Sequence, residues 1–209
     1  MPAAKFTRDG ILDAAAEEVL TRGSGADVTI GAVARRLGAP SGSIYHRFPS
    51  REELLVRLWI RSVRRFHERY LAAGREADPQ RAILDMAVCV ATFTRDHRAD
   101  AAAMTLFRQS RLMASAPESC RAEVVEINAG VNERLAELTV ARYSRPSPRH
   151  RVLVRVAAID SPYGLVRPYV GDAVPSWLAE VIRASSGAVL ELGDRRRRPR
   201  DGELAGFSA

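Results

Sequence analysis

Apolar residues recur along most of this chain at intervals of three and four, the spacing that places them on one face of an α-helix. Between residues 7 and 22, one such face carries Ile11, Leu12, Ala15, Val19 and Leu20. Runs in which apolar and polar residues strictly alternate, as in a half-buried strand, are scarce. The pattern therefore predicts an all-α protein.

Glycine and proline divide this pattern into separate helices. The expected segments are 7–22, 29–36, 40–47, 51–73, 79–97, 100–113, 117–143, 148–169 and 175–192. Gly23 and Gly38 follow the first two segments, where glycine can adopt the left-handed conformation of a helix C-cap without steric strain. Pro162 lies inside the segment 148–169, and we expect it to kink or split that helix near Asp160 and Ser161.

Positive charge is concentrated in the N-terminal third of the chain. Residues 1–75 carry 13 basic and 8 acidic side chains, whereas residues 76–193 carry 14 of each. A basic N-terminal unit suits a polyanionic partner, because neutralised phosphates release their counterions. The Arg-rich tail 194–209 has no apolar periodicity, so we expect it to be disordered, with contact between its arginines and nucleic acid as the alternative.

The remaining composition indicates a cytoplasmic protein without a membrane span, metal or cofactor. Cys89 and Cys120 are far apart, no secretory leader pattern is visible, and the apolar stretches are too short to cross a bilayer. The histidines lie in separate segments, and neither cysteine has metal-ligand spacing to another ligand type. We interpret Asp96-His97 with Asp100, the nearest approach to a metal site, as a solvated helix end.

The stretch from Thr29 to Leu55 has the properties of a helix-turn-helix. Two short helices that cross at a steep angle need a tight corner and small residues, which Ala32, Ala34, Gly38 and Ala39 provide. The second of these helices presents small and polar side chains that can donate to phosphate or meet base edges. This helix is therefore the candidate for insertion into a DNA groove.

The same stretch resembles the N-terminal domain of the TetR family of transcriptional regulators. The matching positions are Thr29-Ile30, Val33-Ala34, Gly38, Gly42, Ile44-Tyr45, Phe48 and Glu52-Glu53-Leu54-Leu55. Two positions depart from the family pattern, because Arg51 stands where lysine is usual and Arg47 where histidine or tyrosine is common. The motif covers residues 7 to about 55.

The resemblance implies a division between residues that contact DNA and residues that hold the unit together. The candidates for DNA binding are Thr29, Ser41, Gly42, Ser43, Tyr45, His46 and Arg51. We expect Thr29, Tyr45 and Arg51 to clamp phosphates, with packing as the alternative role for Tyr45. The core residues are expected to be Ile44, Phe48, Leu54 and Leu55.

By the same resemblance, the rest of the chain would enclose a small-molecule site and dimerise. Candidate pocket residues are Met86, Val90, Phe93, Met104, Phe107 and Tyr163. Neighbouring polar residues that could orient a ligand are Cys89, Thr92, Thr94 and Gln109. Ordinary core packing is the alternative role for the apolar ones, and helix capping for the polar ones.

Two apolar stripes near the C-terminus could form a four-helix seam with a second copy. Their residues are Val152, Val156, Ile159, Trp177, Val181, Ala184 and Ala188. Intramolecular core is again the alternative. We also expect an exposed arginine run on the helix 51–73, made of Arg57, Arg61, Arg64 and Arg65.

The sequence thus predicts an N-terminal three-helix DNA-binding domain, residues 1–50, joined by the long helix 51–73 to a helical ligand-binding and dimerisation domain within 51–193. The resemblance implies a homodimeric repressor that a small-molecule effector releases from a palindromic double-stranded operator. No phosphate loop, nucleophile elbow or carboxylate pair indicates an enzyme. An all-helical enzyme and a partner-binding scaffold are the alternatives.

Overall fold

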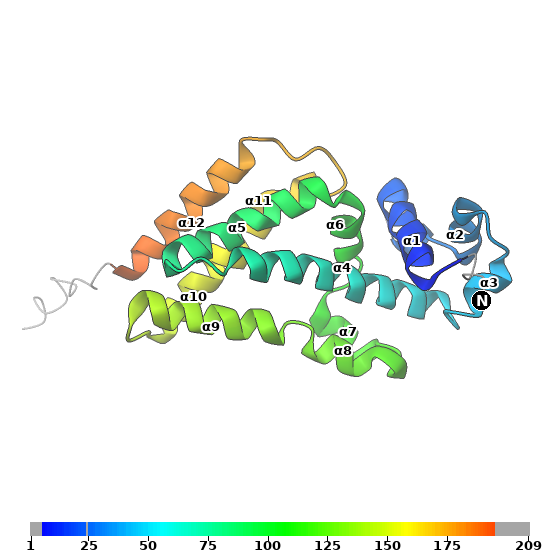
Figure 1. Cartoon of the computed structure of the whole chain (residues 1–209), viewed down its shortest axis with the longest axis horizontal. Helices are drawn as coiled ribbons and strands as arrows, with labels where there is room; N and C mark the ends of the chain where they lie inside the picture. Colours follow the sequence, from blue (N-terminus) through cyan, green and yellow to red (C-terminus); the bar gives the residue numbers. More distant parts are fainter. Residues whose placement is uncertain (1–5, 24, 195–209) are drawn as a thin grey trace, which may run out of the picture.

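A computed structural model of the chain describes residues 6–23 and 25–194, and all regular structure in these ranges is helical (Figure 1). Helices α1–α3 gather at one end of an elongated molecule, and α4 runs from them into the body formed by the later helices (Figure 1). None of the described helices is both long and apolar enough to cross a membrane. Apart from Asp194, the tail expected to be disordered lies outside the described residues.

The head, which we define as α1–α3 with the start of α4, follows the predicted boundaries closely. Its helices are α1 (Arg8–Arg22), α2 (Ile30–Leu37), α3 (Ser41–Tyr45) and α4 (Arg51–Ala73). Thr7, Thr29 and Ser50 cap three of them, because each hydroxyl accepts a hydrogen bond from a backbone N–H in the first turn. Gly23 and Gly38 close α1 and α2 with φ angles of +68° and +64°, a conformation that L side chains avoid.

The body contains more breaks than the sequence predicts. Its helices are α5 (Pro79–Asp96), α6 (Arg98–Met104), α7 (Gln109–Ser115), α8 (Arg121–Glu126), α9 (Ala129–Tyr143), α10 (Pro148–Arg155), α11 (Ser161–Val166) and α12 (Leu178–Asp194). The predicted helix 100–113 is interrupted after Thr105, where Leu106 and Phe107 pack against α4 and the head. The predicted helix 117–143 is interrupted at Asn128, whose amide donates to Gln109 Oε1 at 2.6 Å. Tertiary packing decides both breaks.

Pro162 disrupts its helix as expected, and the disruption takes the form of a π-helical segment, Val156–Asp160. Proline has no N–H, so Pro162 cannot donate to the carbonyl one turn before it, which is Ala158 in an α-helical register and Ala157 in a π-helical register. Side chains donate to both of these carbonyls. The Tyr70 hydroxyl donates to Ala158 O at 2.7 Å, and the Ser186 hydroxyl donates to Ala157 O at 2.7 Å. Helices α4 and α12 thereby hold the π segment from two sides.

Three clusters of buried residues follow the length of α4. The head cluster surrounds Ile44, Phe48 and Leu54, and it includes Ala102 and Ala103 from α6 of the body. A second cluster packs α4 around Trp59 against α7 and α8. The third joins the far part of α4 to α5, α9, the π segment and α12. Because α6 contributes to the core of the head, the two units share a packed junction.

Candidate functional site

Helix α3 combines a buried inner face with an exposed outer face. Ile44 and Phe48 are fully buried, as expected for core residues. Tyr45 is 53% exposed, and His46 is also exposed. Ser41 and Gly42 are exposed and Ser43 is half-buried on the same short helix. The structure therefore brings all the expected groove-facing residues of α3 together on one side of the head.

The corner before α3 depends on Gly38. Its left-handed conformation lets its N–H donate to Arg35 O at 3.2 Å, and the next N–H, of Ala39, donates to Ala34 O at 3.0 Å. Pro40 then leads into α3 with an extended backbone. This geometry ends α2 sharply and turns the chain into the next helix, which is what a helix-turn-helix requires.

Thr29 stands at the N-terminus of α2, where its Oγ1 accepts from Ala32 N at 3.1 Å. Thr29 is exposed, and this contact uses its hydroxyl as an acceptor. The hydroxyl proton remains free to be donated outward. Capping and the expected phosphate contact are therefore compatible at this residue.

The guanidinium of Arg51, which the sequence suggested as a phosphate clamp, contacts backbone carbonyls of the protein itself. Its Nε donates to Val28 O at 2.5 Å, and its Nη2 donates to Gly25 O at 2.5 Å and Ala26 O at 2.9 Å. These carbonyls belong to the connection between α1 and α2, so the guanidinium ties that connection to the start of α4. The sequence could not reveal this, because the partners are backbone atoms more than twenty residues away.

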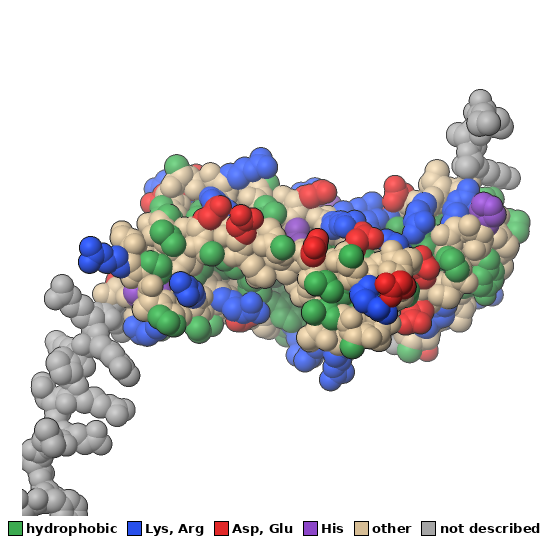
Figure 2. All heavy atoms as spheres, turned by 90° about the horizontal axis from the view of Figure 1, so that it is seen from below, with side chains coloured by type: hydrophobic (Ala, Val, Ile, Leu, Met, Phe, Trp, Pro, Cys, Tyr) green, Lys and Arg blue, Asp and Glu red, His purple; other side chains and the backbone are tan. Residues whose placement is uncertain are grey.

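The surface of the head carries further arginines, and Figure 2 shows basic and acidic side chains mixed on it. Arg22 and Arg36 both contact the buried Glu18 at 2.7 Å, and their hydrogen bonds lower the pKa of that carboxyl below its usual range. Arg47 donates to Ser43 O at 3.2 Å, and Arg8 lies over the Phe48 ring at 4.6 Å. The basic excess of the N-terminal third therefore includes arginines with structural partners.

The arginine run on α4 is paired with acidic residues, and only Arg64 is exposed as expected, whereas Arg57, Arg61 and Arg65 are half-buried. Arg57 and Arg64 both form ion pairs with Glu123 of α8, the latter at 2.8 Å. Arg61 pairs with Asp13 of α1 at 2.8 Å. Arg65 pairs with Asp100 of α6 at 3.1 Å. The run thus links α4 to helices on both sides of it.

Asp100 is likewise not part of a solvated helix end. It is only 7% exposed, and it accepts a hydrogen bond from the Ser62 hydroxyl at 2.7 Å in addition to the contact from Arg65. Asp96 pairs instead with its neighbour Arg95 at 2.8 Å. Within the described residues, no group of three His, Cys, Asp or Glu side chains could hold a metal ion.

A cavity of about 330 Å³, partly open to solvent, lies in the body between α4, α5, α9 and the segment from Arg155 to Val166. Five of the six expected ligand contacts line it: Val90, Phe93, Met104, Phe107 and Tyr163. Met86 does not. It is fully buried beside Gly74, where a Cβ on that glycine would lie 2.7 Å from the Met86 sulfur. Periodicity placed Met86 on an inner face of α5 and could not show which neighbour that face meets.

The polar residues expected near the cavity divide in the same way. Thr94 and Gln109 line it, whereas Cys89 and Thr92 lie on another side of α5, in a separate shallow hollow. The cavity also contains His67, which the sequence did not indicate as a ligand contact. Burial lowers the pKa of His67 to about 4, so its imidazole is neutral at pH 7.

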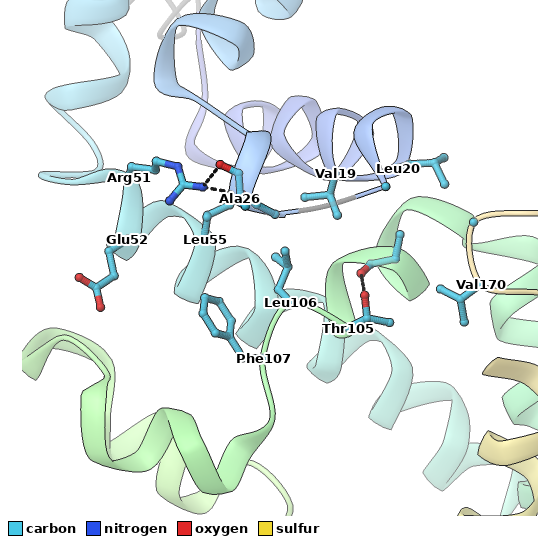
Figure 3. Close-up of a pocket in the computed structure, with 14 residues that line it drawn as sticks. Val19, Leu20, Ala26, Arg51, Glu52, Leu55, Thr105, Leu106, Phe107 and Val170 are labelled. Carbon is cyan, nitrogen blue, oxygen red and sulfur yellow. Dashed lines mark hydrogen bonds between the residues drawn. The ribbon is translucent and has the colours of Figure 1, made fainter. Parts of the chain in front are cut away.

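A second hollow, of about 660 Å³, separates the head from the body (Figure 3). Leu55 of α4 lies near Leu106 and Phe107, and Arg51 lies at the edge of the hollow (Figure 3). Leu20 of α1 lines its other end, on the side of Val170 and Gly171. At the closest point, a Cβ on Gly25 would lie 2.2 Å from Leu106 Cδ2, so a larger residue there would displace the leucine side chain. The junction is thus tightly packed in one place and open beside it.

Most of the residues expected at a dimer seam are exposed on α10, on α12 or just before it, whereas Ile159 of the π segment packs against the body core and lines the cavity. Val152, Trp177 and Val181 are 59%, 55% and 40% exposed, which is unusual for large apolar side chains. Ala184 and Ala188 are also exposed, and Val156 and Ile159 are half-buried. These residues are therefore not simply intramolecular core.

Comparison with known proteins places the head in a family. A model described as "Bacterial regulatory proteins, tetR family" matches residues 11–58. This range begins in α1, includes α2 and α3, and ends in α4. A search of curated proteins gave no match.

Solved structures share the fold of most of the chain. The TetR family regulator PfmR from Thermus thermophilus is 20% identical, with 87% of this chain and 97% of that chain covered and a TM-score of 0.68. The ketosteroid transcriptional regulator KstR2 of Mycobacterium tuberculosis is 21% identical, with coverages of 88% and 93% and a TM-score of 0.67. The fatty acid degradation regulator FadR from Bacillus halodurans is 16% identical, with coverages of 91% and 96% and a TM-score of 0.67.

The family match coincides with the helix-turn-helix whose outer face carries Tyr45 and His46. It disfavours the alternatives of a helical enzyme and a partner-binding scaffold. Residues 11–58 therefore match the tetR family of bacterial regulatory proteins, and this match supports a DNA-binding transcriptional regulator.

Proposed function

We propose that this regulator is a homodimeric repressor whose two α3 helices enter successive major grooves of a palindromic operator. The observation that carries the proposal is the division of α3, in which Ile44 is fully buried and the next residue, Tyr45, is 53% exposed. Such a helix can present side chains to DNA without disturbing its own packing.

Within this proposal, the contacts divide into two kinds. Thr29 and Tyr45 donate to phosphates, which fixes the position of the head, while His46 and the serines of α3 meet base edges. Arg51 has a different role from the one that the sequence suggested. Its three carbonyl contacts hold the connection before α2, and so set the position of Thr29.

Dimerisation has a physical reason and a suitable surface. A single five-residue helix reads few bases, whereas two copies related by a two-fold axis double the contacts on half-sites about 34 Å apart. The exposed apolar face around Val152, Trp177 and Val181 suits a seam with the same face of a second copy.

The cavity in the body suits a small-molecule effector. Its volume lies at the lower end of the range of about 300–1,000 Å³ that is typical of ligand sites, and its walls are mostly apolar. One structural relative, FadR from Bacillus subtilis, was solved in complex with stearoyl-CoA; it is 18% identical, with a TM-score of 0.59. That relative supports the idea of an apolar effector site.

Coupling would run along α4, which contacts both the cavity and the head. Trp59 and Phe66 line the cavity, and Arg61, between them in sequence, pairs with Asp13 in the head. The open part of the junction leaves room for the head to change its orientation. The effector needs only to bind more tightly to the arrangement that does not fit the operator.

Operator recognition can be tested by measuring binding to DNA from upstream of the protein's own gene and to random duplexes of equal length, over a range of salt concentrations. Specific recognition predicts much tighter binding to one upstream fragment. Tyr45→Ala should weaken that binding about tenfold, the scale of one lost contact, with unchanged helical content. Val125→Ala, at an exposed residue of α8, is the control and should bind normally.

Equal and steeply salt-dependent binding to all duplexes would refute an operator-specific role. Full affinity in Tyr45→Ala would remove this residue from the DNA contacts.

A further inference from the structure

We propose that the cavity accepts an amphipathic anion, with an apolar body inside and a single negatively charged head group at a mouth formed by Asn132, Arg155 and Tyr163. This inference rests on the proposed effector role and specifies the chemistry of the effector. It is carried by the distribution of hydrogen-bond donors around the cavity.

The polar groups inside the cavity are already used by the protein. Trp59 Nε1 donates to Met104 O at 3.2 Å, and the Thr94 hydroxyl donates to Val90 O at 2.8 Å. The Tyr70 hydroxyl is engaged by Ala158 O. The His67 imidazole is neutral at pH 7, because burial lowers its pKa to about 4.

The amides at the end of the cavity near α8 are also satisfied. Gln109 Nε2 donates to Val124 O at 2.8 Å and Val125 O at 3.1 Å, and Gln109 Oε1 accepts from Asn128. A ligand that carried polar groups into this interior would find few open partners, and a buried polar group without a partner is costly. The part of the ligand that enters the cavity is therefore apolar.

Two exposed residues of the cavity wall, Asn132 and Tyr163, have polar groups that the protein does not use. No hydrogen bond within the described part of the chain engages the side-chain amide of Asn132 or the hydroxyl of Tyr163. Thr105, which is also exposed, differs from them because its hydroxyl donates to Ala102 O at 2.7 Å. Asn132, Tyr163 and Arg155 supply an amide, a hydroxyl and a guanidinium from α9, α11 and α10. Their open donors suit an oxygen-rich acceptor.

The charged side chains of the cavity wall also favour an anionic ligand. Among the residues that the structure describes, no Asp or Glu lines the cavity, and Arg155 is its only side chain with a full positive charge at neutral pH, because His67 is neutral. Asp160 contacts Arg155 Nε at 3.5 Å, and the Arg155 side chain is 60% exposed. This leaves the outer guanidinium nitrogens available for a bidentate contact with a carboxylate.

The proposal can be tested with decanoate and its neutral ester, methyl decanoate, below the concentrations at which they aggregate. Calorimetric titration of the full chain should show decanoate binding about tenfold more tightly, because a charge-assisted contact is lost in the ester. In Arg155→Met, which keeps an apolar stem, the two ligands should bind equally. Arg151→Met, at an exposed residue of α10 that does not line the cavity, should retain the preference.

A second variant locates the binding. Val90→Phe should fill the cavity and weaken both ligands together, whereas binding at the protein surface would survive this change. Equal affinities in the unchanged protein, tighter binding of the ester, or no binding of either ligand would overturn the proposed anion class.

An operator-release assay separates this result from the proposed function. If the ester, or decanol, bound and released DNA while decanoate did not, the effector role would stand and the anionic head group would be wrong. If decanoate bound through Arg155 without changing operator affinity, the ligand class would stand and the repressor mechanism would be wrong.

Discussion

The head and the body of this protein differ in where their candidate functional side chains lie: on the outer surface in the head, and within the hydrophobic core in the body. In the head, Tyr45 and His46 point outward from a core that includes Ile44 and Phe48. In the body, Phe93 and Val90 are themselves buried core residues and also form the cavity wall. Recognition and stability are therefore separable in the head, whereas in the body one side chain serves both.

The largest expected effect is the loss of stability when the buried Phe48 ring is removed from the core of the head. Phe48→Ala removes a fully buried ring from a small core, and it should lower the free energy of unfolding by about 3–5 kcal/mol. Phe107→Ala, at a half-buried residue of the cavity wall, should cost less, because solvent already reaches it. Urea denaturation of both variants measures the difference, and an equal loss would remove the contrast between the two regions.

A second test uses the histidine of the cavity wall. In the folded protein burial depresses the pKa of His67 to about 4, from an ordinary value of 6.5. The unfolded chain therefore binds the proton first as the pH falls. The His67 contribution to stability is complete above pH 6.5 and is lost between pH 6.5 and 4, by up to about 3 kcal/mol.

In His67→Gln, the free energy of unfolding should consequently depend less on pH across this window. Denaturation curves at about pH 4, 5, 6 and 7 provide the measurement. An unaltered acid dependence would mean that other groups cause it and that the cavity is wetter than its walls suggest.

The smallest effect concerns a single hydroxyl. Tyr70→Phe removes the hydroxyl that donates to Ala158 O in the turn before Pro162, and it should cost about 1–3 kcal/mol. The control is Tyr169→Phe, which removes a hydroxyl for which the described structure records no hydrogen bond. Thermal unfolding compares the two, and equal melting temperatures would show that the π segment does not need the Tyr70 contact.

The contrast between the regions also explains how far the sequence alone could lead. The head was predictable because its signals are local: Thr29, Gly38 and Ser50 fix helix ends through atoms at most five residues away. The family pattern added the order of these signals. All four helices of the head segment agree with the expected boundaries within about two residues.

Contacts between distant segments were not predictable in the same way. The direction of Arg51 depends on carbonyls before α2, and the pairing of Arg61 depends on Asp13 in α1. The break after Thr105 depends on packing of Leu106 and Phe107 against other helices. Periodicity indicates that a face is apolar or charged, but the partner of that face is a property of the fold.

The π segment carries one further consequence, which concerns the counting of residues. Val152 and Arg155 precede Val156–Asp160, and Tyr163 follows it. A π turn contains one residue more than an α turn. In an uninterrupted α-helix, one extra residue would rotate everything beyond it by about 100° around the helix axis and would turn Tyr163 out of the cavity wall that it shares with Arg155. The π turn absorbs the extra residue locally, so the cavity mouth and the exposed apolar face keep their alignment.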